Sequence, residues 1–173
     1  NEKNEEIKKY FLTREEMIIY IFNQTDFKYI FAHNSEYDFT VLFDNIILNL
    51  DNEALFVGSM FIKAKKDGII FMNSLAILKS SVESLGKASG KEKLIISEKF
   101  IKGIRVTIEE TDIEYCFRDC IIPYDYLCTI FEHTEKLKPT VASCSMEIFT
   151  KKFLKRNFKL NEYNEKFRES YYG

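Results

Sequence analysis

Residues 27–39 read FKYIFAHNSEYDF, and this stretch decides the fold class. Its first six residues are apolar except for Lys28, as is typical of a strand buried inside a sheet. Polar residues follow at once, and the spacing of apolar residues then predicts a helix over 39–50. A buried strand that leads into a helix is typical of α/β proteins, so we expect a sheet flanked by helices.

Further elements are predicted on both sides of this stretch. Capping residues and apolar periodicity predict helices over 13–24, from Ser80 to about Gly86–Gly90, from Thr107 through Asp119, and over about 143–158. Two strands are predicted over 54–65 and 69–72, joined by the hairpin turn signal Asp67-Gly68. A lysine-rich stretch at 87–102 has no clear period, and Pro123 is expected to kink or restart the long helix.

The composition narrows the class of protein. The chain has 173 residues, 46% of them hydrophobic, with a formal net charge of −2. This size predicts one domain with a sizeable core, and the apolar content excludes a disordered chain. The balanced charge excludes a strongly basic nucleic-acid coat protein, but a channel for one DNA strand needs only local positive charge. No apolar run is long enough to span a membrane, so no membrane partner is expected.

Four cysteines stand at positions 116, 120, 128 and 144. The first three are spaced by four and eight residues on one predicted helix, so they share a face. A zinc site would require Cys-x-x-Cys knuckles or nearby histidines, and the sequence has only His33 and His133. We therefore expect reduced thiols in the core and, with no secretory signal visible, an intracellular protein.

Polar residues emerge where the first strand ends, from His33 to Asp38. Ligands bind at such strand ends in open α/β sheets, although Asp38 could instead simply cap the following helix. A second candidate is the pair Tyr115 and Asp119, which share one helix face; the alternative is a solvated aspartate beside a core tyrosine. The stretch Asn73-Ser74-Leu75, just after the last predicted strand, is a third feature.

In this order, the three features resemble the proofreading domain of family B DNA polymerases, specifically the protein-primed branch of phages and linear plasmids. The segment His33-Asn34-x-x-Tyr37-Asp38 resembles the second exonuclease motif of the family, and Tyr115-x-x-x-Asp119 resembles the third. Ser74-Leu75-x-x-Leu78 is similar to the motif that contacts the single strand. The resemblance implies a ribonuclease-H-like fold of the DEDDy exonuclease type, with a mixed sheet flanked by helices.

Three further segments extend the resemblance over nearly the whole chain. Lys93, in Lys93-Leu94-Ile95-Ile96, resembles the lysine motif of this branch, although Lys91 also fits its spacing. Residues 138–153 resemble the Pro-Thr-x-x-Ser segment of the plasmid members. Tyr171-Tyr172-Gly173 resembles the start of the Tyr-x-Gly-Gly motif that joins the exonuclease and polymerase halves. An exonuclease domain over 1–135 and a connection toward a polymerase domain over 136–173 are thus implied.

The resemblance also implies a role for each candidate residue. Asp38 and Asp119 would be two of four carboxylates that hold two Mg²⁺ or Mn²⁺ ions, which clamp the entering and leaving oxygens of a phosphodiester. Tyr115 would orient the attacking water, and Lys93 would neutralise phosphate charge. The single-stranded 3′ end of DNA would be held by the remaining site residues: His33, Asn34, Tyr37, Ser74, Leu75 and Phe100.

Two departures from the family pattern limit what this chain is expected to do. The first exonuclease motif, an Asp-x-Glu, does not precede the helix over 13–24, and the nucleotidyl-transfer aspartates of a polymerase half are absent. We therefore expect an N-terminally incomplete region of a longer DNA polymerase, inactive as a nuclease by itself. DNA is the expected partner, a terminal priming protein is a further candidate, and the cytoplasm or mitochondrion is the expected location. A non-catalytic ribonuclease-H-like scaffold and a stand-alone exonuclease stay open as alternatives.

Overall fold

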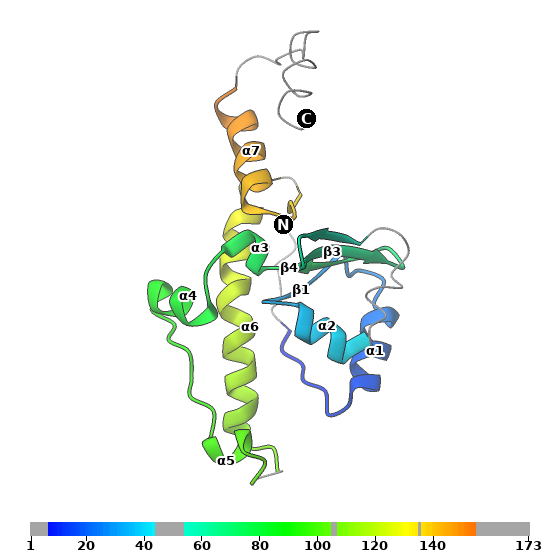
Figure 1. Ribbon diagram of the computed structural model, residues 1–173, viewed down its shortest axis with the longest axis vertical. Helices are drawn as coiled ribbons and strands as arrows, with labels where there is room; N and C mark the ends of the chain where they lie inside the picture. The colour runs from blue at the N-terminus through cyan, green and yellow to red at the C-terminus, as the bar shows by residue number, and fades with distance from the viewer. Residues whose placement is uncertain (1–6, 44–53, 105–106, 135, 155–173) are drawn as a thin grey trace.

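The structure, a computed structural model, describes residues 7–43, 54–104, 107–134 and 136–154. A four-stranded mixed sheet is flanked by helices (Figure 1). The strand order is β1-β4-β3-β2. Strand β1 (Tyr29–Ala32) is parallel to β4 (Ile69–Asn73), and β3 (Met60–Lys66) and β2 (Leu55–Val57) continue the sheet as antiparallel neighbours. The predicted α/β class with a mixed sheet is therefore confirmed.

One face of the sheet packs against α1 (Arg14–Asn23) and α2 (Glu36–Phe43). The rings of Phe39 and Phe43 on α2 meet the ring of Phe71 on β4 edge to face, with centroids 5.6 and 5.3 Å apart. Edge-to-face contact is a favoured arrangement for aromatic pairs. The buried members of this cluster are Ile21, Phe39, Leu42, Phe43, Phe61, Ala64, Ile69 and Phe71.

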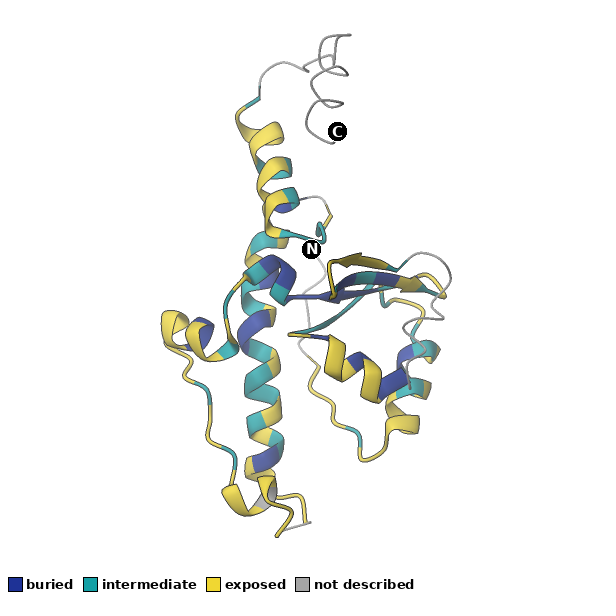
Figure 2. Ribbon diagram, viewed as in Figure 1, coloured by how far each residue is buried: buried dark blue, intermediate teal, exposed yellow. Residues whose placement is uncertain are grey.

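The opposite face packs against α3 (Leu75–Leu78), α6 (Glu110–Phe131) and α7 (Val141–Lys152). Its core contains Met72, Ile77, Leu127 and Cys144, against which Tyr29, Phe31 and Ile70 pack. The two faces use alternate residues of β1 and β4, because successive side chains of a strand point to opposite sides. Figure 2 shows the buried residues gathered on β3, β4 and α3, whereas most of α7 is exposed.

Helix α4 (Val82–Ser89) packs on α6, and the hydroxyl of Tyr126 donates a 3.1 Å hydrogen bond to the carbonyl of Leu85. Residues 90–97, which we call the strap, then run beside α6 to α5 (Glu98–Ile101) (Figure 1). The strap begins where the N–H of Lys91 donates to the carbonyl of Gly86 (2.9 Å). It brings its lysines close to the surface of α6.

Several boundaries differ from the sequence-based predictions for local reasons. The single strand predicted over 54–65 is two strands, because Gly58 adopts a left-handed φ of 60° and reverses the chain between β2 and β3. Strand β1 is half-buried rather than buried, since it pairs only with β4 among the described residues. Helix α2 begins at Glu36 instead of 39, and the predicted continuation over 44–50 lies outside the described residues.

The predicted starts of three helices were also displaced, while the first was correct. Thr13 caps α1 as predicted, by accepting a 3.2 Å hydrogen bond from the N–H of Glu16. The residues that cap α4 and α6 are Ser81 and Glu109 instead of Ser80 and Thr107. Helix α7 begins at residue 141 rather than 143. Helix α6 continues through Pro123, so the proline does not restart it.

Candidate nucleic-acid site at the strand ends

The parallel pairing of β1 with β4 brings two polar segments to one edge of the sheet. Ala32 and Asn73 are register partners, and the N–H of Ser74 extends the ladder by donating to the carbonyl of Ala32 at 3.0 Å. The segment from His33 to Asp38 leaves β1 at this edge, directly beside the segment that leaves β4. Carboxyl ends of parallel strands form ligand sites for this reason.

His33 joins the two polar segments through both nitrogens of its ring. Nδ1 lies 3.0 Å from the hydroxyl of Ser74, and Nε2 lies 2.9 Å from the carbonyl oxygen of Ser80. Burial lowers the pKa of His33, although the bond to Ser80 and the charges of Asp119 and Asp38 oppose this change. The ring is then neutral near pH 7, and Nε2 carries the proton because a carbonyl oxygen can only accept.

Three later residues of this segment are exposed, whereas Ser35 between them is buried. Asn34 is exposed and has a left-handed φ of 63°, which turns the chain from β1 toward α2. Tyr37, in the first turn of α2, is 75% exposed, so its ring is available for stacking. Asp38 is exposed as a residue, yet partial burial of its carboxyl raises the pKa, against a hydrogen bond with its own backbone and the charge of His33. Asn34 and Tyr37 are thus exposed members of the predicted DNA-binding set, and Asp38 is the predicted metal-binding carboxylate beside them.

Helix α6 contributes the second carboxylate together with a lysine from the strap. The Nζ of Lys93 lies 3.0 Å from Oδ2 of Asp119 and 5.2 Å from the ring centroid of Tyr115. The hydrogen bond to Tyr115 raises the pKa of Lys93 most; burial opposes this rise, and Asp119 adds to it. The other oxygen of Asp119, Oδ1, is buried without a hydrogen-bond partner in the described part of the chain.

The contacts of Lys91 and Lys93 distinguish between these two candidates for the lysine motif. Lys93 lies against the predicted pair Tyr115 and Asp119, whereas Lys91 forms an ion pair with Asp125, six residues farther along α6. Because Lys93 alone of the two contacts the candidate residues, it is the better match to the predicted role.

The strand-end and helix halves of the candidate site share one electrostatic environment. The charges of Asp38 and Asp119 both act on His33. Burial of the thiol is the main cause that raises the pKa of Cys120, although the residue as a whole is exposed, and the charges of Asp119 and Asp38 add to it. Leu75 is half-buried at the start of α3, and Phe100 belongs to α5. Tyr171 and Gly173 of the predicted linking motif lie outside the described residues.

Some residues that build the site were missed from the sequence. Asn73 was noted only as part of a polar stretch, yet its carboxamide is buried and bonded to three segments. The available signal was an asparagine that ends an apolar strand. Ser80 contributes a backbone carbonyl, for which the sequence carries no signal.

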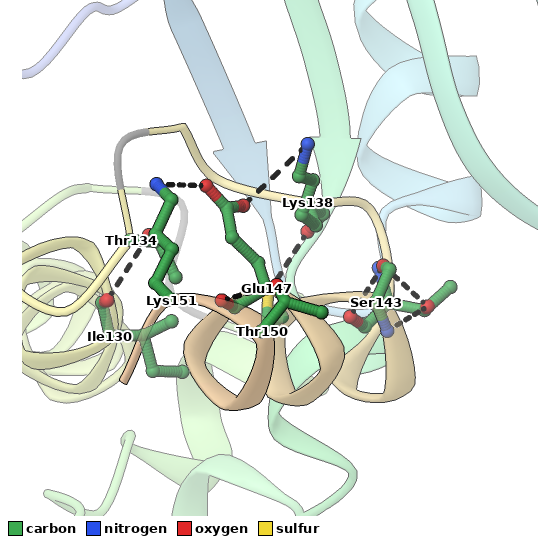
Figure 3. Close-up of polar contacts among 9 residues, drawn as sticks. Ile130, Thr134, Lys138, Ser143, Glu147, Thr150 and Lys151 are labelled. Atoms are coloured by element: carbon green, nitrogen blue, oxygen red, sulfur yellow. Dashed lines mark hydrogen bonds and ion pairs between the residues drawn. The ribbon is translucent and has the colours of Figure 1, made fainter. Parts of the chain in front are cut away.

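The segment that resembles the Pro-Thr-x-x-Ser motif has a structural role of its own. Thr140 and Ser143 form a reciprocal capping box at the start of α7. One turn later, Glu147 contacts Lys138 at 3.6 Å and Lys151 at 2.7 Å, as Figure 3 shows. The thiol of Cys144 donates to the carbonyl of Lys138 at 3.4 Å. These contacts tie the loop before α7 to the helix.

The cysteines only partly follow the prediction of core thiols. Cys144 is buried and Cys128 is half-buried, but Cys116 and Cys120 are exposed. The prediction was wrong for these two, because the part of α6 that carries them lies away from the sheet contact made by Leu127. All four are free thiols.

Among the described residues, no group of three or more His, Cys, Asp or Glu side chains is arranged to hold a metal ion. Hard divalent ions such as Mg²⁺ require several oxygen ligands. Asp119 offers one unpaired buried oxygen, and its other oxygen is bound to Lys93. Asp38 and Asp119 therefore do not fit a complete two-metal site by themselves.

Comparison of the chain with protein-family models, curated proteins and solved structures found no significant match. Within the described ranges, no helix combines the length and the apolar character needed to cross a bilayer. The geometry of the site therefore carries the functional inference.

Proposed function

We propose that this chain is the 3′–5′ exonuclease region of a family B DNA polymerase of the protein-primed type, and that its site holds the single-stranded 3′ end of DNA. One observation carries the proposal. His33 at the end of β1 bonds the carbonyl of Ser80 just before α4, and α4 packs on α6. On α6, Asp119 and Tyr115 both contact Lys93. Apart from Ser80, these residues belong to the segments that resemble the exonuclease motifs, and they are far apart in sequence.

The sheet supports the ribonuclease-H-like form of this proposal. Strand β1 is apolar and has helices on both faces, which is the environment of an interior parallel strand. Among the described residues it nevertheless pairs with β4 alone. The proposal assigns the other edge of β1 to the first strands of the exonuclease, which would carry the missing Asp-x-Glu motif.

The exposed residues would bind the bases of the DNA strand, and the charged residues would contact its phosphate backbone. Tyr37 would stack on a base, and Asn34 would form a hydrogen bond with the edge of a base or with a sugar. Lys93 would neutralise a phosphate. Mg²⁺ or Mn²⁺, when bound, would supply the charge stabilisation of phosphodiester hydrolysis, and it would need carboxylates beyond Asp38 and Asp119. The described residues alone thus favour binding over cleavage.

Binding of a short fluorescent oligonucleotide, followed by anisotropy across a salt series, tests this function. One lost stacking contact is worth about 1–3 kcal/mol, so Tyr37→Ala should weaken binding about tenfold. Tyr10→Ala is the matched control, because Tyr10 is also exposed (56%) but belongs to none of the candidate segments. Replacing Lys91 and Lys93 together should flatten the salt dependence, since phosphate contacts release counterions.

Two results would contradict the proposal. Equal binding by Tyr37→Ala and Tyr10→Ala would mean that residues 34–38 are only a helix-capping turn. The gene sequence on both sides provides a second test, because the proposal requires an upstream Asp-x-Glu motif and downstream polymerase motifs. If neither is present, a non-catalytic scaffold of the same fold replaces it.

A further inference from the structure

A single buried carboxamide connects three segments at the candidate site. Asn73 is the last residue of β4 and is only 1% exposed. Its Oδ1 accepts hydrogen bonds from the N–H of Asn34 (3.2 Å) and the N–H of Leu75 (3.0 Å). Its Nδ2 donates to the carbonyl of Phe61 on β3 at 3.0 Å. The side chain of Asn73 thus contacts the residues that follow β1 and β4, and also the antiparallel strand β3.

No other natural side chain of this size supplies the same pattern. The backbone groups of Asn34, Leu75 and Phe61 present two donors and one acceptor, and buried backbone groups require partners. A carboxamide has an acceptor oxygen and a donor nitrogen in one plane. An ionised carboxylate would place an oxygen against the carbonyl of Phe61, and an aliphatic side chain would leave all three groups unpaired.

The bond to Asn34 falls where the chain leaves β1. Asn34 has a φ of 63°, a left-handed conformation that is uncommon for residues other than glycine. The preceding residue, His33, is held by Ser74 at the same edge. Two consecutive residues after β1 are therefore bonded to the last residue of β4 and to the residue that follows it. Helix α2 begins two residues after Asn34, at Glu36.

We propose that Asn73 is a positioning residue of the candidate site, because it holds the left-handed turn at Asn34 and thereby sets where Tyr37 and Asp38 stand. Asn73 acts through the backbone and does not contact DNA. The expected effect of Asn73 on DNA binding rests on the proposed function. The hydrogen bonds of Asn73 to the backbone do not depend on that function.

The variant Asn73→Asp tests this role, because it changes one donor into an acceptor at nearly constant volume. At about pH 7.5 the ionised carboxylate opposes the carbonyl of Phe61, and we expect oligonucleotide binding at least about tenfold weaker than that of the parent chain. Burial raises the pKa of such a carboxyl. Near pH 5 its proton can be donated to Phe61, and we expect binding within about twofold of the parent measured at the same pH.

The matched control is Asn23→Asp, the same change at the exposed end of α1. The charge of His33 also depends on pH, so each variant is compared with the parent chain at each pH. The control should stay close to the parent throughout. If Asn73→Asp behaves like Asn23→Asp at both pH values, or if low pH brings no recovery, the positioning role is refuted.

Amide hydrogen exchange of the parent chain tests the bonds without DNA and without any variant. The amides of Asn34 and Leu75 should exchange at least about a hundredfold more slowly than the amide of Gly68 in the exposed turn after β3. Equally fast exchange would overturn the proposal, even if Asn73→Asp fails to fold. A parent chain that binds no oligonucleotide would refute the proposed function, and exchange would then decide the role of Asn73 alone.

Discussion

Replacing Lys93 with methionine removes the positive charge from the candidate site and keeps an unbranched side chain that is shorter by one atom. The Lys93–Asp119 ion pair spans 3.0 Å, with side chains 34% and 24% exposed. Lys91, two residues earlier on the same strap, pairs with Asp125, with side chains 46% and 42% exposed. Lys91→Met is therefore a control that removes the same kind of contact from a more solvated position.

The expected loss of stability follows from this difference in exposure. Exposed ion pairs contribute about 0.2–1 kcal/mol, whereas removing one partner of a fully buried pair costs about 3–5 kcal/mol. The pair at Lys93 lies between these limits, and its contact with the ring of Tyr115 adds about 0.5–1 kcal/mol. We expect Lys93→Met to lower the free energy of unfolding by about 2 kcal/mol, and Lys91→Met by less than about 1 kcal/mol.

Urea unfolding at neutral pH measures both losses. The double variant Lys93→Met/Asp119→Asn should recover most of the stability, because it leaves no unpaired carboxylate. The pKa of Lys93 is raised in the folded chain, so its contribution is complete below the ordinary lysine pKa and is lost as pH rises through the higher value. The difference between parent and Lys93→Met should thus close only at a pH above the ordinary lysine pKa. Equal losses at Lys91 and Lys93, or no recovery in the double variant, would refute the reasoning.

Three other perturbations have expected outcomes. Phe71→Ala removes a fully buried ring that contacts three other phenylalanines, and urea unfolding should show a loss of about 3–5 kcal/mol. Gly86→Ala places a Cβ 2.6 Å from the carbonyl oxygen of Lys91, so a thermal melt should show a net loss of about 1 kcal/mol despite the better helix former. Asp38→Asn should raise the melting temperature at pH 7 and leave it unchanged near about pH 3, because the raised pKa of Asp38 makes its ionised form unfavourable to folding; a lower melting temperature at pH 7 would contradict this.

The parts of the fold that were predictable depend on short stretches of sequence. The capping pair Thr13 and Glu16 located α1 to within a residue, and the apolar run before His33 located β1. The change from apolar to polar residues at His33 also marked the strand end at which the candidate site lies. Each of these signals lies within a few residues of the feature that it predicts.

The remaining features depend on contacts between distant segments. The helical spacing of Cys116 and Cys120 shows that they share a face, but only the packing of α6 decides whether that face is covered. The three partners of Asn73 become its neighbours only after β1, β3 and β4 have paired. The sequence is apolar on both sides of Gly58, and the left-handed φ of this glycine is visible only in the structure, so β2 and β3 appeared continuous.

The parallel pairing of β1 with β4 also has a consequence for how the chain folds. Strands β2, β3 and β4 follow one another through short turns. Their contacts are local in sequence, so these strands can pair early in folding. Strand β1 instead pairs with residues 41 positions away in the sequence, as Tyr29 does with Ile70. Closing this long loop costs conformational entropy before the contacts between the strands can form. Asp119 on α6 is separated from β1 by a still longer stretch of sequence. The candidate site is therefore expected to assemble late in folding, after a hairpin core that contains none of its charged groups.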